Sequence, residues 1–396
     1  MNPAPYDLHP PYATAPRTQD AVERHSTMTS AAVVEEDLRY IGSALEHELA
    51  CLSGAHVLLT GGAGFLGYYF VQSVLHWNKQ VSEPRRIRMT VYDNYARGVP
   101  RWLTDLAHDP ALTVIKQDIT HPLPPDMPLF RYVIHAASIA SPTYYRRHPI
   151  QTMDANVNGL RALLEYFRAL NDAQTPLGGF LFFSSSEIYG DPSPENIPTP
   201  EEYRGNVSCT GPRACYDEAK RYGETLCVNF ARHYGLPITI ARPFNNYGPG
   251  LKISDRRVIP DFARDIHAGR DIVVHSDGSP QRTFCYVADA IIGYYKVLVR
   301  GRAGEAYNIG TEAPEISMNE LAARLAGIAH DLYGYRGRPV RQDSADREYL
   351  VDNPSRRCPS IAKARSELGF NPTISIDEGL RRLLIWYAEN HDGEDA

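Results

Sequence analysis

Residues 60–67 read TGGAGFLG, and this stretch decides the fold. It follows the apolar run His56–Thr60 and precedes a helical pattern, so it forms the turn between a strand and a helix. The glycines at positions 61, 64 and 67 let the backbone turn tightly and bring its N–H groups close to a ligand. The N-terminus of the following helix favours a negatively charged group. The stretch therefore predicts a turn that binds the pyrophosphate of a dinucleotide.

Further apolar runs of strand length alternate with helical stretches after this turn. They are Arg88–Tyr92, Leu112–Lys116, Tyr132–His135, Phe180–Ser184 and Pro237–Arg242. Strands that alternate with helices form a parallel sheet with helices on both faces. We therefore expect an α/β fold with a Rossmann-type, doubly wound parallel sheet. Three more helices are expected at Val258–Ala268, Val287–Val299 and Ser317–Leu332.

The pattern divides the chain into four segments. Residues 1–30 are rich in Pro, Ala, Thr and Ser without a hydrophobic period, so we expect a flexible tail. In residues 31–54 apolar side chains recur every three or four positions, which predicts an amphipathic helix over a sheet edge or a subunit partner. Residues 55–245 are expected to form the dinucleotide-binding domain. Residues 246–390 are expected to form mainly a smaller substrate-binding lobe, with some return to the first domain.

Composition disfavours several other classes of protein. The chain has 396 residues and a net charge of −6, with 41 basic and 47 acidic residues interspersed, so we expect no nucleic acid partner. The 6 cysteines contain no C-x-x-C pair, which indicates no metal site, no disulfide framework and a reducing cytoplasm. Every apolar run is shorter than the roughly 18 residues of a transmembrane helix, so we expect no membrane partner.

Two acidic residues at the ends of strand runs indicate which dinucleotide binds. Asp93 ends the run after the glycine turn, where a carboxylate accepts hydrogen bonds from the adenosine ribose and repels a 2′-phosphate. This favours NAD over NADP. Asp118 ends the next run, where it either contacts adenine or caps a turn.

A tyrosine and a lysine point to acid–base chemistry. Tyr216 and Lys220 lie four residues apart in a helical stretch, so both project from one helix face. An ammonium group beside the phenol would lower the tyrosine pKa toward neutrality and make it a general base. Ser185 follows the strand run that ends at Ser184, and could hydrogen-bond the same substrate hydroxyl.

Several motifs in this order resemble those of the extended short-chain dehydrogenases/reductases that act as sugar-nucleotide epimerases, dehydratases and decarboxylases. The similarity spans about residues 55–385 and includes HAA at 135–137, NVNG at 156–159 and RPFNNYGP at 242–249. It implies a nucleotide-sugar substrate and NAD as cofactor. Tyr216 would take the proton of the sugar 4-hydroxyl as the hydride leaves C4, giving a 4-keto intermediate.

Within this family, residues 211–221 (GPRACYDEAKR) and 185–192 (SSEIYGDP) resemble UDP-glucuronate decarboxylases, also called UDP-xylose synthases. Ser186 stands where 4,6-dehydratases carry an aspartate. The resemblance implies decarboxylation of UDP-glucuronate to UDP-xylose or a related UDP-pentose. The alternatives are a 4-epimerase, a 4,6-dehydratase in which Glu187 takes the C5 proton, a pentose synthase that rearranges the ring, and a non-catalytic NAD-binding regulator.

The motifs also imply individual site residues. The expected catalytic residues are Ser185, Glu187, Tyr216 and Lys220. The expected cofactor residues are Gly61, Gly64, Phe65, Leu66, Gly67, Asp93, Asn94, Asp118, Ile119, Ala136, Ala137, Tyr216 and Lys220. The expected substrate residues are Ser141, Tyr145, Ser186, Glu187, Asn245, Arg257 and Arg282.

Further arginines are expected near the anionic groups of the substrate. Arg282 matches an arginine near the substrate carboxylate or diphosphate in the family, and Arg257 and Asn245 are expected at the diphosphate. Arg146 and Arg147 depart from the family pattern, and either meet an anion or form a solvated loop.

Apolar residues in 156–170 and 212–234 exceed the needs of one core face, and related enzymes pair these helices, so we expect a homodimer.

Overall fold

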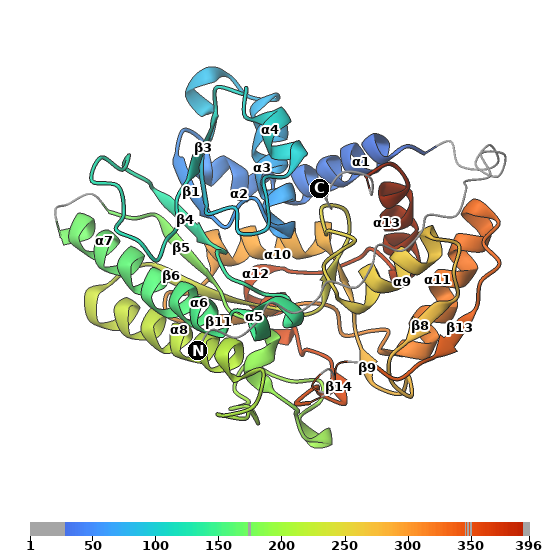
Figure 1. Cartoon of the computed structure of the whole chain (residues 1–396). Helices are drawn as coiled ribbons and strands as arrows, with labels where there is room; N and C mark the ends of the chain where they lie inside the picture. The colour runs from blue at the N-terminus through green and yellow to red at the C-terminus, as the bar shows by residue number, and fades with distance from the viewer. Residues whose placement is uncertain (1–27, 173–175, 345, 347, 349–350, 391–396) are drawn as a thin grey trace, which may run out of the picture.

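The computed structural model describes residues 28–172, 176–344, 346, 348 and 351–390. Its centre is a seven-stranded parallel sheet in the order β11-β6-β5-β4-β1-β2-β3 (Figure 1). The strands are β1 (His56–Thr60), β2 (Arg88–Asp93), β3 (Leu112–Lys116), β4 (Tyr132–His135), β5 (Gly179–Phe183), β6 (Ile238–Pro243) and β11 (Ala306–Ile309). The predicted fold class is confirmed. Residues 1–27 of the predicted tail lie outside the described residues.

Six of these strands match the predicted runs to within one residue at each end, whereas β11 was not predicted. It carries a polar residue, Asn308, that interrupts the apolar pattern. The structure buries Asn308 completely and pairs its side chain with the Tyr189 hydroxyl at 2.7 Å and the Thr199 carbonyl at 3.0 Å. A satisfied amide is tolerated in the core, so β11 adds a seventh strand without an apolar signature.

Helices cover both faces of the sheet because strand side chains alternate between the faces. Val57 and Leu59 of β1 join the larger core cluster, while Leu58 joins the second one. The larger cluster contains α3 (Phe65–Asn78) and α10 (Val287–Arg300). The second contains α7 (Leu160–Asp172) and α8 (Ala214–Tyr234), which lie together at the lower left in Figure 1.

The N-terminal segment forms two helices, α1 (Ser30–Ala44) and α2 (Glu46–Leu52), instead of the single helix predicted for residues 31–54. The apolar stripe is buried as predicted; it comprises Leu38, Ile41, Leu45, Leu49 and Leu52. However, α1 packs against α3, α10 and α13 (Ile376–Asn390) of its own chain. Asp37, which is fully buried, accepts hydrogen bonds from Tyr286 and from Arg382 of α13, each at 2.6 Å. The segment therefore covers a helix layer and not a sheet edge.

The C-terminal part contributes to both the sheet and a smaller lobe. α10 and β11 belong to the sheet layers, as described above. In addition, α12 (Ala362–Leu368) packs against these two elements. The lobe holds α9 (Val258–His267), α11 (Met318–Tyr333) and α13, and the short strands β7 (Asn246–Tyr247), β8 (Ile272–Val274), β9 (Gln281–Arg282), β10 (Cys285–Tyr286), β12 (Ile316–Ser317), β13 (Pro339–Arg341) and β14 (Arg356–Arg357). Three further short helices are α4 (Arg101–Leu106), α5 (Pro142–Arg147) and α6 (Pro149–Asp154).

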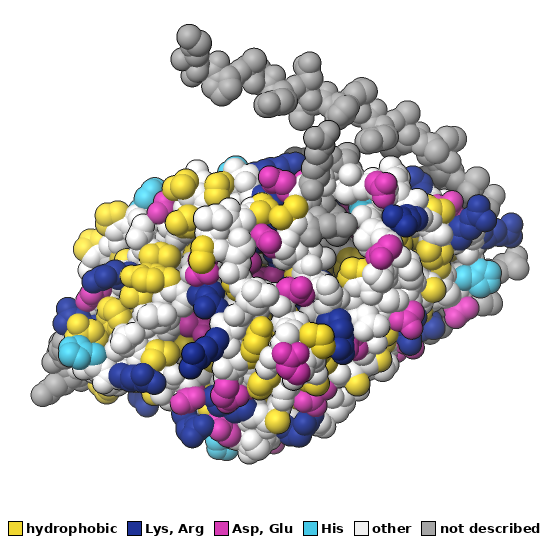
Figure 2. Space-filling view, turned by 90° about the horizontal axis from the view of Figure 1, so that it is seen from below, with side chains coloured by type: hydrophobic (Ala, Val, Ile, Leu, Met, Phe, Trp, Pro, Cys, Tyr) yellow, Lys and Arg dark blue, Asp and Glu magenta, His cyan; other side chains and the backbone are white. Residues whose placement is uncertain are grey.

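Two surface properties bear on the predicted partners. On the face drawn in Figure 2, acidic and basic side chains lie interspersed among polar and apolar ones. Among the described residues, no helix combines the length and the apolar character that crossing a bilayer requires.

Candidate functional site

A cavity of about 780 Å³ lies where the parallel strands end. Gly61 follows β1, Asp93 ends β2, Ala136 follows β4 and Ser184 follows β5, and all four residues line the cavity. Ligands of doubly wound sheets bind at these carboxyl ends, because the loops that follow the strands leave a crevice there. The C-terminal lobe supplies further lining residues, including Arg282.

The glycine turn has the close packing that the sequence predicts. Gly61 adopts a φ of +73°, and a Cβ there would lie 2.6 Å from the Cα of Ala137. A Cβ on Gly67 would lie 2.0 Å from the carbonyl oxygen of Gly62, so only glycine lets α3 pack this close to the turn. Gly67 does not line the cavity, unlike the other predicted cofactor residues.

Asp93 and Asp118, which are predicted to contact the ribose and the adenine of the cofactor, both line the cavity and cap turns. Asp93 accepts hydrogen bonds from the backbone N–H groups of Ala63 at 3.0 Å and Tyr95 at 2.8 Å. It therefore fixes the glycine turn relative to β2. Asp118 accepts from the Asn94 amide at 2.9 Å and the Thr120 N–H at 2.9 Å. The capping role of these carboxylates is thus compatible with a ligand-facing role.

Tyr216 and Lys220 project from α8 into the cavity wall, as predicted. Lys220 Nζ donates to the Phe183 carbonyl at 2.7 Å and lies 5.6 Å from the centroid of the Tyr216 ring. Burial lowers the pKa of Lys220 to about 7. Burial also raises the pKa of Tyr216, and a hydrogen bond with Ser185 only partly opposes this rise. The predicted lowering of the tyrosine pKa by Lys220 is therefore wrong for this structure, because desolvation of the phenolate dominates.

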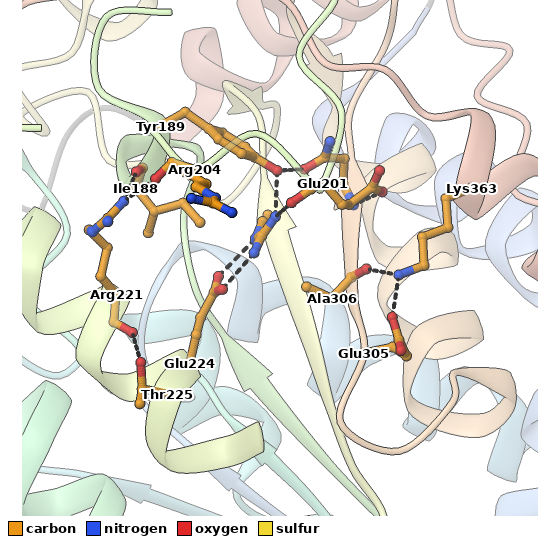
Figure 3. A network of polar contacts seen from close by, with 12 residues as sticks. Ile188, Tyr189, Glu201, Arg204, Arg221, Glu224, Thr225, Glu305, Ala306 and Lys363 are labelled. Atoms are coloured by element: carbon orange, nitrogen blue, oxygen red, sulfur yellow. Dashed lines mark hydrogen bonds and ion pairs between the residues drawn. The ribbon is translucent and has the colours of Figure 1, made fainter. Parts of the chain in front are cut away.

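Ser185 and Glu187 are held by the short turn that follows β5. Ser185 Oγ accepts from the Glu187 N–H at 3.1 Å and so caps the 3₁₀ turn Ser186–Tyr189. Figure 3 shows how polar contacts from α8 hold this turn. Arg221 donates to the Ile188 carbonyl at 2.9 Å, and Arg242 of β6 bridges Glu224, at 2.6 and 2.8 Å, and the Tyr189 hydroxyl, at 2.6 Å. The network fixes Ser185 and Glu187 relative to the helix that carries Tyr216.

Glu187 lies between two arginines that the sequence did not identify as site residues. Glu187 Oε2 accepts from Arg213 Nη2 and from Arg357 Nη2, each at 2.5 Å. Burial alone would favour the neutral acid, but the two guanidinium groups outweigh it and lower the pKa of Glu187 to about 2. Glu187 is therefore an ionised carboxylate at neutral pH and a weak proton acceptor.

Arg282 and Asp217 also interact with Glu187. We define the arginine cluster as Arg213, Arg282 and Arg357 with Glu187 and Asp217. Burial, followed by the charge of Glu187, raises the pKa of Asp217 to about 8. Burial, followed by the charge of Arg357, lowers the pKa of Arg282 to about 9. At pH 7 the cluster therefore holds three cations, one anion and one neutral acid, with Asp191 and Asp352 as further carboxylates nearby. Arg213, Arg282, Arg357 and Glu187 line the cavity, so an anion can approach the excess positive charge.

The structure shows why Arg213 and Arg357 were not predicted from the sequence as site residues. Arg357 lies on β14, where it stands beside Arg282 of β9 in the parallel register of a two-residue pairing. Nothing in a local pattern predicts this long-range contact. Arg213 does stand in the 211–221 segment, three residues before Tyr216, and its place in that motif was an available signal.

The other predicted substrate residues do not all reach the cavity. Ser141, Ser186, Asn245 and Arg257 line it. Tyr145 does not line it, and its ring stacks on that of Tyr216, with ring centroids 5.0 Å apart and planes 9° apart. The substrate contact of Tyr145 stays a prediction, and the ring of Tyr145 supports that of Tyr216.

Arg146 and Arg147, for which the sequence left two interpretations open, differ in their surroundings. Arg146 lines the cavity and pairs with Asp346, with Nη2–Oδ2 at 2.6 Å. Arg147 is exposed, which fits the solvated-loop interpretation for that residue.

Comparisons with known proteins agree with this geometry. The model of the NAD dependent epimerase/dehydratase family matches residues 57–310. The chain is 33% identical over 338 residues to UDP-glucuronic acid decarboxylase 5 of Arabidopsis thaliana, covering 85% of this chain and 91% of the relative. It is 31% identical over 331 residues to UDP-glucuronic acid decarboxylase 1 of Xenopus tropicalis, covering 84% and 72% respectively.

Solved structures give the same result. A UDP-glucose 4-epimerase of Thermotoga maritima, crystallised with UDP-glucose, is similar with a TM-score of 0.70 and 25% identity over 84% of this chain and 99% of that one. A dTDP-glucose 4,6-dehydratase of Streptomyces venezuelae, crystallised with NAD, has a TM-score of 0.70 and 27% identity over 85% and 97%. The predicted resemblance and the predicted cofactor, NAD, are confirmed, and the glycine cradle and Asp93 fit that cofactor.

Proposed function

This chain belongs to the NAD dependent epimerase/dehydratase family, and we propose that it decarboxylates UDP-glucuronate to UDP-xylose or a related UDP-pentose. One observation carries the proposal. Beside Tyr216, the cavity wall holds three arginines, and Glu187 is the one ionised carboxylate that pairs directly with two of them, so the arginine cluster itself carries excess positive charge. A sugar with a carboxylate at C6 supplies the missing negative charge, whereas a sugar with a hydroxyl there does not.

The residues around Tyr216 suit the first step of the reaction, which is the oxidation of the sugar at C4. NAD, when bound, accepts the hydride from sugar C4 and later returns it. Tyr216 takes the proton of the 4-hydroxyl, and Ser185 hydrogen-bonds the same oxygen. Lys220 lies on the same helix face, where its charged form would favour the tyrosinate. The 4-ketone makes the C6 acid a β-keto acid, whose C5–C6 bond breaks as carbon dioxide leaves and the electron pair passes to an enolate.

The arginine cluster suits the second step. Arg357 and Arg282 line the cavity on neighbouring strands, where they can hold the C6 carboxylate in one orientation. Protonation at C5 and return of the hydride complete the reaction.

The same cluster weighs against dehydration. Loss of water across C5 and C6 requires a base for the C5 proton, and the residue expected in that role is Glu187. Two arginines hold its pKa at about 2, so it is a poor base. Ser186 also replaces the aspartate that dehydratases carry beside this glutamate.

We also propose a homodimer formed through α6 and α8. The two helices pack together, and each leaves apolar side chains exposed: Ile150 and Met153 on α6 and Tyr222 on α8. Exposed apolar side chains on neighbouring helices are typical of a subunit interface. Light scattering of the wild type against a Met153→Glu variant tests this, and equal masses at the monomer value would contradict it.

The reaction is tested by incubating the purified protein with UDP-glucuronate, UDP-glucose and dTDP-glucose and following nucleotide-sugar masses. We expect UDP-glucuronate to lose the mass of carbon dioxide and both glucose compounds to stay unchanged. Loss of the mass of water from a glucose compound would make the chain a dehydratase. An unchanged mass with a new retention time would make it an epimerase, and no turnover of any of the three would contradict the proposal.

The role of the cluster is tested by Arg357→Gln, with the neighbouring Arg356→Gln as control. Arg356 is on the same strand, but it pairs with Glu315 at 2.6 Å and does not line the cavity. Since Arg357→Gln also leaves Glu187 short of one buried cation, we expect kcat/KM for UDP-glucuronate to fall about 100-fold or more. Equal kcat/KM in the two folded variants would contradict the role of Arg357.

A further inference from the structure

A second ion-pair cluster lines the same cavity, and the reaction steps above do not use it, although one member, Arg257, is also predicted at the substrate diphosphate. The buried carboxylate of Asp255 pairs with the guanidinium groups of both Arg97 and Arg257. The Asp255 side chain is 3% exposed, whereas each arginine side chain is 35% exposed. All three residues line the cavity. We call Arg97, Asp255 and Arg257 the Asp255 clasp.

The clasp joins three loops that are distant in the sequence. Arg97 lies in the loop after β2, Ser141 and Tyr144 lie at the start of α5, and Asp255 lies in the loop before α9. The Ser141 hydroxyl donates to the Asp255 carbonyl at 2.7 Å. The Arg97 guanidinium lies 4.5 Å from the centroid of the Tyr144 ring. Lys252 Nζ also donates to the Arg97 carbonyl at 3.1 Å, so the loops after β2 and before α9 meet at two points.

The position of the clasp relates it to the cofactor groove. The Arg257 guanidinium lies 5.9 Å from the centroid of Phe65, the first residue of α3 after the glycine turn. Arg97 stands four residues after Asp93 at the end of β2. The clasp therefore lies beside the first residue of α3, and its Arg97 belongs to the loop that follows Asp93. With two cations and one anion, it also has a net positive charge toward a negatively charged dinucleotide.

We propose that the Asp255 clasp closes the cofactor groove and retains NAD between turnovers. The proposal rests on the NAD dependence of the family and not on the identity of the sugar. Retention is compatible with catalysis, because a reaction that returns its hydride leaves NAD in its starting redox state. Release of NAD then requires the Arg97–Asp255 pair to separate, which leaves a buried carboxylate with one cation fewer.

The rate of cofactor release tests the clasp directly. The protein is loaded with NADH and mixed with an excess of NAD, and the loss of bound-nicotinamide fluorescence gives the release rate. We expect Arg97→Gln to raise this rate about tenfold over the wild type. Arg101→Gln is the matched control: it lies four residues further along, its side chain is 93% exposed, and it does not line the cavity. Its release rate should equal that of the wild type.

A second variant and a change of salt keep the test independent of folding. Asp255→Asn should also speed release, and adding Arg97→Gln to it should speed release no further, because both changes break the same pair. High salt should speed release from the wild type more than from Arg97→Gln, because the pair is partly exposed. A folded Arg97→Gln protein that releases NADH within about twofold of Arg101→Gln would overturn the clasp. So would additive effects of the two clasp substitutions. No sugar substrate is present, so this result is separate from that of the decarboxylation assay.

Discussion

Burial sets the proton affinities of Tyr216, Lys220 and Asp217 more strongly than any neighbouring charge does. The spacing of Tyr216 and Lys220 predicts that they share a helix face, and the structure agrees. It does not predict how deeply the helix is buried, because burial depends on strands and loops that are distant in the sequence. The direction of the tyrosine pKa shift was therefore predicted wrongly, although both residues were placed correctly.

Tyr216→Phe removes the proposed base without changing the shape of the cavity. We expect kcat to fall about 100- to 10,000-fold, since general acid–base catalysis contributes on that scale. Tyr234→Phe, which changes an exposed tyrosine at the end of the same helix, is the control and should keep wild-type kcat. If Tyr216→Phe kept more than about a tenth of wild-type kcat, Tyr216 would not be the base.

Asp217→Asn tests the raised pKa through stability. The folded pKa of about 8 lies above the ordinary value of 3.8, so the folded chain keeps a proton that the unfolded chain loses as the pH rises. Asp217 therefore lowers the stability of the wild type increasingly from about pH 4 to about pH 8, and Asn, which does not ionise, avoids this loss. The charged groups that face Asp217 are Glu187, Arg213, Arg357 and Asp352.

Urea unfolding of both proteins at about pH 5 and about pH 8 measures the effect. We expect the stability of Asp217→Asn relative to the wild type to increase by a few kcal/mol between these pH values, since each unit of pKa shift corresponds to roughly 1.4 kcal/mol. A difference that does not change with pH would mean that Asp217 is ionised in the folded chain.

At the level of helices and strands, periodicity predicted most elements and failed where long-range contacts decide. Six strands were predicted because their apolar runs stand between clear breaks. β11 was missed because the amide of Asn308, which interrupts its run, is satisfied by partners from other segments. The N-terminal stripe predicted burial correctly, but the docking onto α13 involves Arg382, which lies 345 residues from Asp37.

Leu45→Ala tests whether the N-terminal helices are an integral part of the fold. Leu45 is fully buried between α1 and α2, and deleting a buried leucine side chain costs about 2–5 kcal/mol. We expect the free energy of unfolding to fall by that amount while kcat stays unchanged, because no residue of α1 or α2 lines the cavity. Ser43→Ala, an exposed neighbour, is the control. Equal stability of the two variants would show that the segment is only loosely attached.

At the scale of the whole molecule, the sheet and the smaller lobe meet around one cavity. The sheet side, with the glycine turn, Asp93 and Tyr216, was predicted from local motifs. The lobe side was predicted only in part: Arg257 and Arg282 were expected, but Arg357 and the grouping of three arginines around Glu187 were not. That grouping arises from short strands and loops whose partners are set by the tertiary fold. It is also the feature that favours a carboxylated sugar.

The most direct test of this account uses UDP-glucuronate with an isotopic label at C6 and an amount of NAD that only matches the protein. We predict that the label leaves entirely as carbon dioxide, that the nucleotide pentose is unlabelled, and that many turnovers occur without accumulation of NADH. Label retained in a converted nucleotide sugar would contradict the central claim that the arginine cluster serves a decarboxylation.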